Sequence, residues 1–120
     1  MGIVRSQKTV RLFAREHGFC WYCGRRDSLH SHHIIGGAGR SDIRENLSRL
    51  CLFCHERAEG TTVCITTHDG RTLRLKPIPL ENVLYLKKRY DPEHYDRKRL
   101  AELAHKQTLP RAVRPKGWAE

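Results

Sequence analysis

The sequence predicts an α+β fold, and three observations carry this prediction. Apolar residues recur at helical spacing in several segments, a strong β-hairpin signal lies past mid-chain, and two cysteine pairs have the spacing of metal-binding turns. A length of 120 residues suits one compact domain. With 38% hydrophobic and 30% charged residues, the composition excludes both a membrane protein and a wholly disordered chain.

The first half of the chain is predicted to hold two helices around a strand–loop–strand unit. Ser6 is a good helix cap and Gly18 a good helix stop. The expected elements are a helix over 7–17, a strand over 29–35 that enters a glycine-rich loop, a returning strand or tight turn over 47–50, and a helix that ends by Gly60.

The second half is predicted to hold a β-hairpin, two helices and a tail. Asp69 and Gly70 form a strong turn signal between two β-prone runs, and Pro92 follows a helix-start aspartate. We expect a single domain over 1–107 with its core at 18–60. The remaining elements are a hairpin over 63–75, helices over 80–90 and 91–106, and a flexible basic tail over 108–120.

Four of the five cysteines form two CxxC pairs, Cys20 with Cys23 and Cys51 with Cys54. The odd count and the absence of a signal-peptide core argue against a disulfide framework. Each CxxC turn offers two thiolates, so together they predict a tetrahedral structural zinc site, with a redox pair or free thiols as the alternatives. Cys64 lies in a predicted strand, where we expect it to be a small buried hydrophobe.

The charge balance points to a polyanionic partner. The chain has 23 Lys and Arg residues against 13 Asp and Glu, a formal net charge of +10, which favours nucleic acid although a basic exterior also serves solubility. No apolar run approaches the ~18 residues of a membrane-spanning helix. By elimination we expect a cytoplasmic protein that does not bind membranes.

An ordered set of polar residues lies between and beside the cysteine pairs. His32 and His33 come first, Asn46 follows, and His55 directly follows the last cysteine. This order, over residues 20–59, resembles the HNH endonuclease family with its ββα-metal fold. The layout is most similar to small HNH endonucleases encoded by bacteriophages. The resemblance implies a metal-dependent DNA endonuclease that hydrolyses phosphodiester bonds by nicking or by double-strand cleavage.

The resemblance also assigns roles by motif position. His33 corresponds to the general base, and His32 and His55 to ligands of one catalytic divalent cation (Mn²⁺, Mg²⁺, Co²⁺ or Ni²⁺). Asn46 corresponds to a residue whose amide holds the loop and orients His33. An imidazole suits the base role because its ordinary pKa leaves it mostly neutral at pH 7. Successive helical residues point about 100° apart, so Cys54 and His55 are able to serve different metals.

Two features depart from a simple reading of the motif. Many HNH sequences carry Asp immediately before the base, where this chain has His32. Two imidazoles without a carboxylate favour transition metals over Mg²⁺. In a regular strand His32 and His33 would point to opposite faces, so the strand must end or bend there. His30 alternates with His32 and is assigned a supporting or surface role.

Four arginines are candidate DNA contacts: Arg40, Arg44, Arg49 and Arg57.

Other functions fit parts of the pattern. A non-catalytic zinc-ribbon DNA-binding adaptor explains the cysteines and the charge but leaves the histidines as coincidence. A toxin-like or restriction nuclease shares the chemistry of an HNH enzyme. The phage resemblance implies a terminase or portal protein as partner and the host cytoplasm as location.

Overall fold

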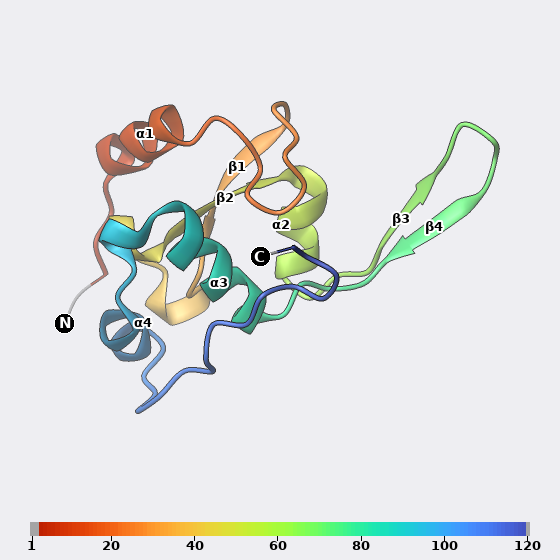
Figure 1. The fold of residues 1–120 in the computed structure, drawn as a ribbon. Coiled ribbons are helices and arrows are strands. Elements are labelled where there is room, and N and C mark those ends of the chain that lie inside the picture. The colour runs from red at the N-terminus through yellow and green to blue at the C-terminus, as the bar shows by residue number, and fades with distance from the viewer. Residues whose placement is uncertain (1–2, 120) are drawn as a thin grey trace.

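A computed structural model of the chain describes residues 3–119, drawn in Figure 1. The structure contains short helices, two separate two-stranded antiparallel sheets and three single-turn 3₁₀ segments. In chain order the elements are α1 (Gln7–Glu16), β1 (Leu29–His33), β2 (Leu47–Cys51), α2 (Leu52–Ala58), β3 (Val63–Thr66), β4 (Thr72–Leu75), α3 (Leu80–Tyr90) and α4 (Arg97–Leu103).

The centre of the molecule is a ββα unit formed by β1, β2 and α2. The two strands pair antiparallel, with Leu29 opposite Cys51 and His33 opposite Leu47. Helix α2 begins at the residue after β2 ends, so the strand delivers the chain directly into the helix. The mixed helix and strand composition is confirmed, as are the returning strand and the short helix after it.

Helices α1 and α3 cover this unit with an aromatic core. Phe13 on α1 and Trp21 are both buried, with their ring centroids 5.7 Å apart in an edge-on contact. Tyr90 at the end of α3 stacks on Trp21 at 5.8 Å. These large aromatic side chains pack beside buried leucines of β2 and α3, including Leu50, Leu84 and Leu86.

A buried ion pair ties α3 to the start of β2. The Lys87 side chain is fully buried, and its Nζ lies 2.7 Å from Asp91 Oδ2. Nζ also donates to the backbone oxygens of Leu47, at 2.8 Å, and Arg44. Because the two backbone acceptors, Arg44 and Leu47, flank residues 45–46, the Lys87 ammonium fixes the segment that carries Asn46.

The region after α3 differs from the single helix expected over 91–106. The structure has a 3₁₀ turn at Pro92–His94 and then the separate helix α4. Asp91 does not cap a helix, because its carboxylate is taken by Lys87 and His94. Asp96 caps α4 instead, accepting a hydrogen bond from the Arg99 N–H at 3.0 Å.

The C-terminal segment packs on the body, where the sequence led us to expect a flexible tail. Leu109 and Pro115 are buried, and the Val113 N–H donates to the Glu81 oxygen at 2.9 Å. The Trp118 ring lies 5.5 Å from that of Tyr22. The apolar residues spaced along this segment find contacts beside α3, which composition alone does not reveal. Within residues 3–119, no helix combines the length and apolar character needed to cross a membrane.

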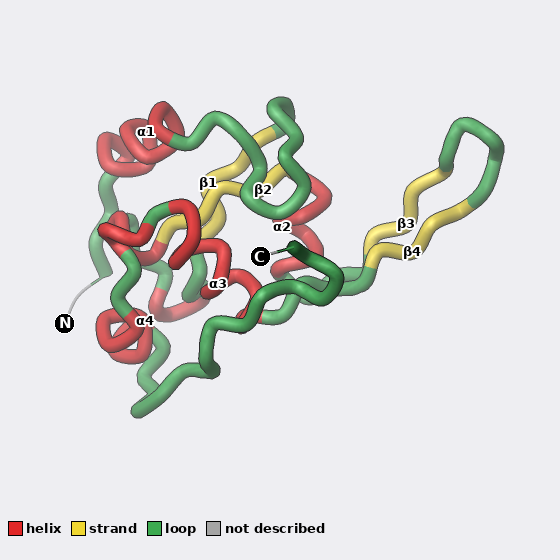
Figure 2. The backbone as a smooth tube through the Cα atoms, in the orientation of Figure 1, coloured by secondary structure: helices red, strands yellow, loops and turns green. Residues whose placement is uncertain are grey.

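Strands β3 and β4 form an arm that projects from the body (Figure 2). They pair antiparallel from Val63–Leu75 to Thr66–Thr72, which confirms the predicted hairpin. Its turn contains Gly70 at φ 83°, a conformation that favours glycine. With the arm, the molecule measures 51 × 29 × 28 Å. Cys64 lies on the arm and is exposed, so the expectation of a buried residue was wrong: the strand has no covering layer there.

Candidate active site

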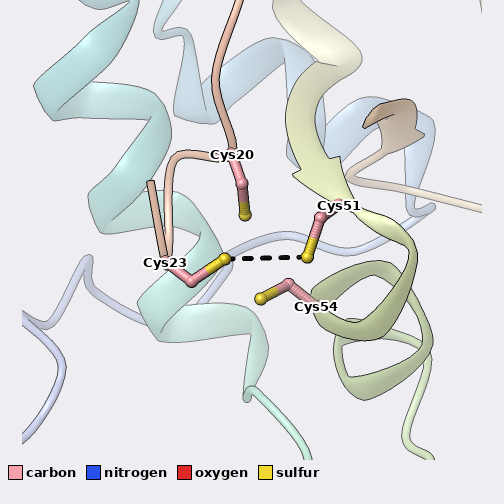
Figure 3. A group of neighbouring side chains, drawn as sticks. All are labelled: Cys20, Cys23, Cys51 and Cys54. Atoms are coloured by element: carbon pink, nitrogen blue, oxygen red, sulfur yellow. Dashed lines mark hydrogen bonds between the residues drawn. The ribbon is translucent and has the colours of Figure 1, made fainter. Parts of the chain in front are cut away.

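Four cysteine side chains converge on one point (Figure 3). Cys20 and Cys23 come from the turn after α1, Cys51 ends β2, and Cys54 lies in the first turn of α2. Their sulfur atoms all lie within 4.8 Å of one another. The first turn is closed by a hydrogen bond from Gly24 N–H to the Cys20 oxygen at 2.9 Å. Gly24 has φ 81°, a conformation that favours glycine.

The donor set and its spacing fit a zinc ion. The sulfur atoms of Cys23 and Cys51 are 3.7 Å apart, close to the ~3.8 Å edge of a tetrahedron with Zn–S bonds of ~2.3 Å. The interaction with Cys54 lowers the pKa of Cys20 to about 4, while the same pairing raises that of Cys54. Four crowded thiols therefore resist full ionisation on their own, and a divalent cation supplies the missing positive charge.

A second cluster lies in an adjacent cleft of about 380 Å³. His32 on β1 and His55 on α2 bring their Nδ1 atoms to 3.0 Å. Glu59, one turn beyond His55, places Oε1 3.2 Å from His55 Nε2. One ring nitrogen from each histidine and one carboxylate oxygen of Glu59 all lie within 4.8 Å of one another, so the cluster can hold a metal ion.

Both imidazoles of this cluster have lowered pKa values, which favours the neutral form of each ring. Burial, followed by the nearby His55 and His33, lowers the pKa of His32 to about 3. Burial also lowers the pKa of His55, against an opposing effect of Glu59. Neutral imidazoles are the form that binds metals. Cys54 and His55 thus belong to two different clusters although they are successive residues of α2.

His33 lines the same cleft and is held from behind by Asp42. The His33 Nε2 lies 2.7 Å from Asp42 Oδ1, and Asp42 also accepts the Ser6 N–H at 2.9 Å. Burial alone would raise the pKa of Asp42, but the hydrogen bonds from His33 and Ser6 leave it below its usual value. An ionised Asp42 accepts the Nε2 proton, which directs the lone pair of the uncharged form of the ring to Nδ1.

Asn46 is fully buried and closes the loop between β1 and β2. Its Oδ1 accepts the Ile35 N–H at 2.7 Å, and its Nδ2 donates to the oxygens of Ile35 and Ser41, each at 3.1 Å. All its side-chain hydrogen bonds therefore span the loop that joins His33 to Asp42. A buried amide with every partner satisfied rigidifies its surroundings.

Of the three comparisons with known proteins, the one with family models gave a match. Residues 20–60 match the family model of the HNH endonuclease. The matched HNH region begins at Cys20 and covers both clusters, and it indicates a nuclease with a divalent metal and DNA as substrate. Neither the curated proteins nor the solved structures gave a match.

Both neighbouring histidines of the HNH motif reach the cleft because β1 ends at His33. His32 is buried as a strand residue, whereas His33 sits where the chain leaves the strand. The bend required by the sequence is therefore present. His30 also lines the cleft, and its ring stacks on that of His55 with centroids 5.4 Å apart and an interplanar angle of 6°.

Of the four candidate arginines, Arg40 is the one that lines the cleft. Arg44 pairs with Glu16 on α1, away from the histidines. Arg49 lies across the strands, with its Nε donating to the His17 oxygen at 3.0 Å. Arg57 donates to the Lys76 oxygen at 2.7 Å. The structure thus places one of the four arginines, Arg40, at the cleft lined by the histidines, and the other three make contacts elsewhere.

The sequence reasoning missed Glu59 and Asp42. The spacing of His55 and Glu59, four residues apart on a helix, was a usable signal for a third ligand. The expectation of a site without a carboxylate was therefore wrong: Glu59 reaches the cluster because α2 continues one turn beyond His55. Asp42 carried no comparable signal, because its contact with His33 depends on the path of the loop.

Proposed function

We propose that this chain is a metal-dependent DNA endonuclease. The observation that carries the proposal is the convergence of His32, His55, Glu59 and His33 on one open cleft. Two of these groups are neutral imidazoles, one is a carboxylate, and His33 is a base aimed by Asp42. This combination of a cation site and a general base is what phosphodiester hydrolysis requires.

In the proposed reaction, His33 Nδ1 takes a proton from the attacking water while Asp42 holds the Nε2 proton of the ring. Asp42 stabilises the imidazolium that forms, since its carboxylate is already within hydrogen-bond distance. Asn46 keeps the two ends of the loop together and so maintains this alignment. Arg40, exposed at the cleft, offers its guanidinium to a phosphate beside the scissile bond.

His32, His55 and Glu59 are the residues that would hold the divalent cation. When bound, the cation neutralises charge on the scissile phosphate and on the departing 3′ oxygen. Two imidazoles and one carboxylate form a mixed donor set that suits Mn²⁺, Co²⁺ and Ni²⁺ and, through the carboxylate, also accepts Mg²⁺. The stacked His30 ring limits the rotation of His55.

The four-cysteine site is proposed as a structural zinc that fixes α2. Cys54 and His55 share this helix, so the zinc orients a ligand of the catalytic cluster. A non-catalytic zinc-ribbon DNA-binding adaptor is the second candidate, favoured by the basic charge alone. It gives no reason for an ionised Asp42 to hold a histidine at the edge of a second donor cluster.

Finer aspects of the function rest on the sequence. A monomer with the active centre proposed here would nick one strand, with double-strand breaks requiring two molecules or two visits. Unoxidised cysteines of a zinc site fit the cytoplasmic location expected above. A link to bacteriophage packaging, through a terminase or portal protein, depends on sequence layout alone, and the comparisons lend it no support.

Metal dependence tests the proposed function. We expect the zinc-loaded protein to nick supercoiled plasmid with Mn²⁺, Co²⁺ or Ni²⁺ at least as fast as with Mg²⁺, because two of its ligands are imidazoles. Glu59→Gln should raise the metal concentration needed for half-maximal cleavage by about 10- to 100-fold. Rates across the metal panel, with a control of zinc-loaded protein that receives no second divalent cation, measure both effects.

Glu102→Gln is the matched control, since Glu102 is an exposed residue on α4 and does not line the cleft. It should leave the metal dependence unchanged. Activity confined to Mg²⁺ would argue against His32 as a ligand, and an equal effect of both substitutions would remove Glu59 from the site.

A substitution at Asp42 tests whether this residue orients the proposed general base, His33. Asp42→Asn should lower the cleavage rate at saturating DNA by about 10- to 100-fold, because the amide has no negative charge to stabilise the imidazolium and has one acceptor oxygen where Asp42 uses two. DNA affinity should stay the same or rise, since a negative charge is removed. Single-turnover rates and binding titrations separate the two quantities. A loss of affinity with an unchanged rate would show that Asp42 supports the loop and not the base.

A further inference from the structure

The β3–β4 arm, defined here as residues 61–77, is fixed to the helix that carries the cleft residues. On one leg, the Thr61 N–H donates to the Glu56 oxygen at 3.1 Å. On the other, Arg57 Nε donates to the Lys76 oxygen at 2.7 Å, and the Ile78 N–H donates to the Arg57 oxygen at 2.9 Å. Both legs of the arm are therefore held by α2, which presents His55 and ends one residue before Glu59.

The far end of the arm is also well ordered by hydrogen bonds. The Thr67 N–H donates to the Arg71 oxygen at 2.8 Å, and the Gly70 N–H donates to the Thr67 oxygen at 3.0 Å. Asp69 and Arg71 form an ion pair at 2.8 Å across the turn. The contacts with α2 fix the base of the arm relative to the cleft, and the bonds within the turn order its tip, which lowers the ordering cost of binding.

The strand register gives the arm two different faces. Residues directly opposite each other in an antiparallel pair share a face. Cys64 opposite Arg74 and Thr66 opposite Thr72 make a polar face, and all four are exposed. The other face is apolar and consists of Val63, Leu75, Ile65 and Leu73, of which Val63 is buried at the base and Leu73 is 45% exposed.

The charge of the arm is positive. Its basic side chains Arg71, Arg74 and Lys76 are exposed, and Asp69 is its single acid. Asp69 is already paired with Arg71. Across residues 3–119, no acidic side chain pairs with Arg74 or Lys76. Two unpaired cations on a projecting ribbon favour a polyanion as the occupant.

We propose that the β3–β4 arm is a second DNA-contacting element. Its polar face, which carries Arg74, lies against the duplex beside the cleft. This inference rests on DNA being the substrate of the proposed endonuclease. A two-stranded ribbon has the dimensions to enter the major groove. From Val63 to Asp69 a fully extended strand rises about 3.3 Å per residue step, or at most ~20 Å in all, which is the length of about six base pairs. The arm thus extends the contact along the DNA to one side of the cut.

The test is a double substitution on the arm, Arg74→Ala with Lys76→Ala. The matched control is Lys98→Ala with Lys106→Ala, which removes the same charge from exposed positions on and just after α4. DNA binding is measured by fluorescence anisotropy against salt, with zinc-loaded protein and no other divalent cation added. The arm variant should lower the slope of log affinity against log salt by about 2, because each lost phosphate contact lowers it by about 1.

Hydroxyl-radical footprinting supplies the second readout. The arm variant should lose protection over about six base pairs on one side of the cleft contact, while the control keeps the full footprint. Equal slopes and footprints for both variants would overturn the proposal. So would sedimentation data in which Leu73→Ser dissociates a dimer while the arm variant binds DNA normally, because the arm would then dock a second copy. A protein that binds through the arm but never cuts would contradict the proposed endonuclease and leave the arm intact.

Discussion

His33→Ala is expected to lower DNA cleavage by about 10²- to 10⁴-fold at neutral pH, the usual contribution of a positioned general base. The reason is geometric. His33 lies at the rim of the cleft, with Asp42 2.7 Å from Nε2, and alanine leaves the attacking water without a proton acceptor. The measurement is the single-turnover rate of supercoiled plasmid nicking with Mn²⁺.

The same variant should keep its fold, its zinc and its affinity for DNA. His33 is not one of the four zinc-cluster residues, and its side chain is partly exposed, so its removal leaves a small gap at the surface. His105→Ala, at an exposed position after α4, is the matched control and should cleave normally. Retained cleavage by His33→Ala would remove the base from the mechanism.

Cys20→Ala should unfold the ββα unit and abolish both zinc binding and cleavage. Structural zinc sites of this kind contribute about 10–16 kcal/mol of apparent binding free energy, more than the ~5–15 kcal/mol net stability of a small domain. Cys20 is fully buried beside the aromatic core, and its cluster joins the turn after α1 to both β2 and α2. Zinc content and backbone NMR spectra measure the loss directly.

The matched control is Cys64→Ala. Cys64 is an exposed cysteine on the arm and lies outside the zinc cluster, so this change should leave zinc content and fold intact. A Cys20→Ala variant that folds well without zinc would contradict the structural role of the metal. The core contacts among Phe13, Trp21 and Tyr90 would then be sufficient to hold the strands.

Much of the fold was predictable because its signals are local. Asp69 and Gly70 specify the hairpin turn, and Ser6 caps α1. The two cysteine pairs bring the junction of β2 and α2 to the turn after α1. The helix expected after Asp91 failed for a tertiary reason. Its start signal was real, but Lys87 and His94 take the carboxylate, so the chain makes a single turn and restarts at Asp96.

The candidate site divides in the same way. The motif predicted that His32, His33 and His55 lie together, and the structure brings them to one cleft. The contact from Asp42 depends on how the loop after Gly36 folds back and on the Ser6 N–H that also binds the carboxylate. Such a contact joins residues that no periodicity relates, so only the folded chain reveals it.

The most direct test of the account is the position of the second metal. Crystals of the zinc-loaded protein, soaked in Mn²⁺, would be measured on both sides of the zinc and manganese absorption edges. The account predicts zinc among Cys20, Cys23, Cys51 and Cys54, and a separate manganese peak between His32, His55 and Glu59 with His33 facing it. Manganese absent from the cleft, with the three imidazoles turned away from a common centre, would contradict it.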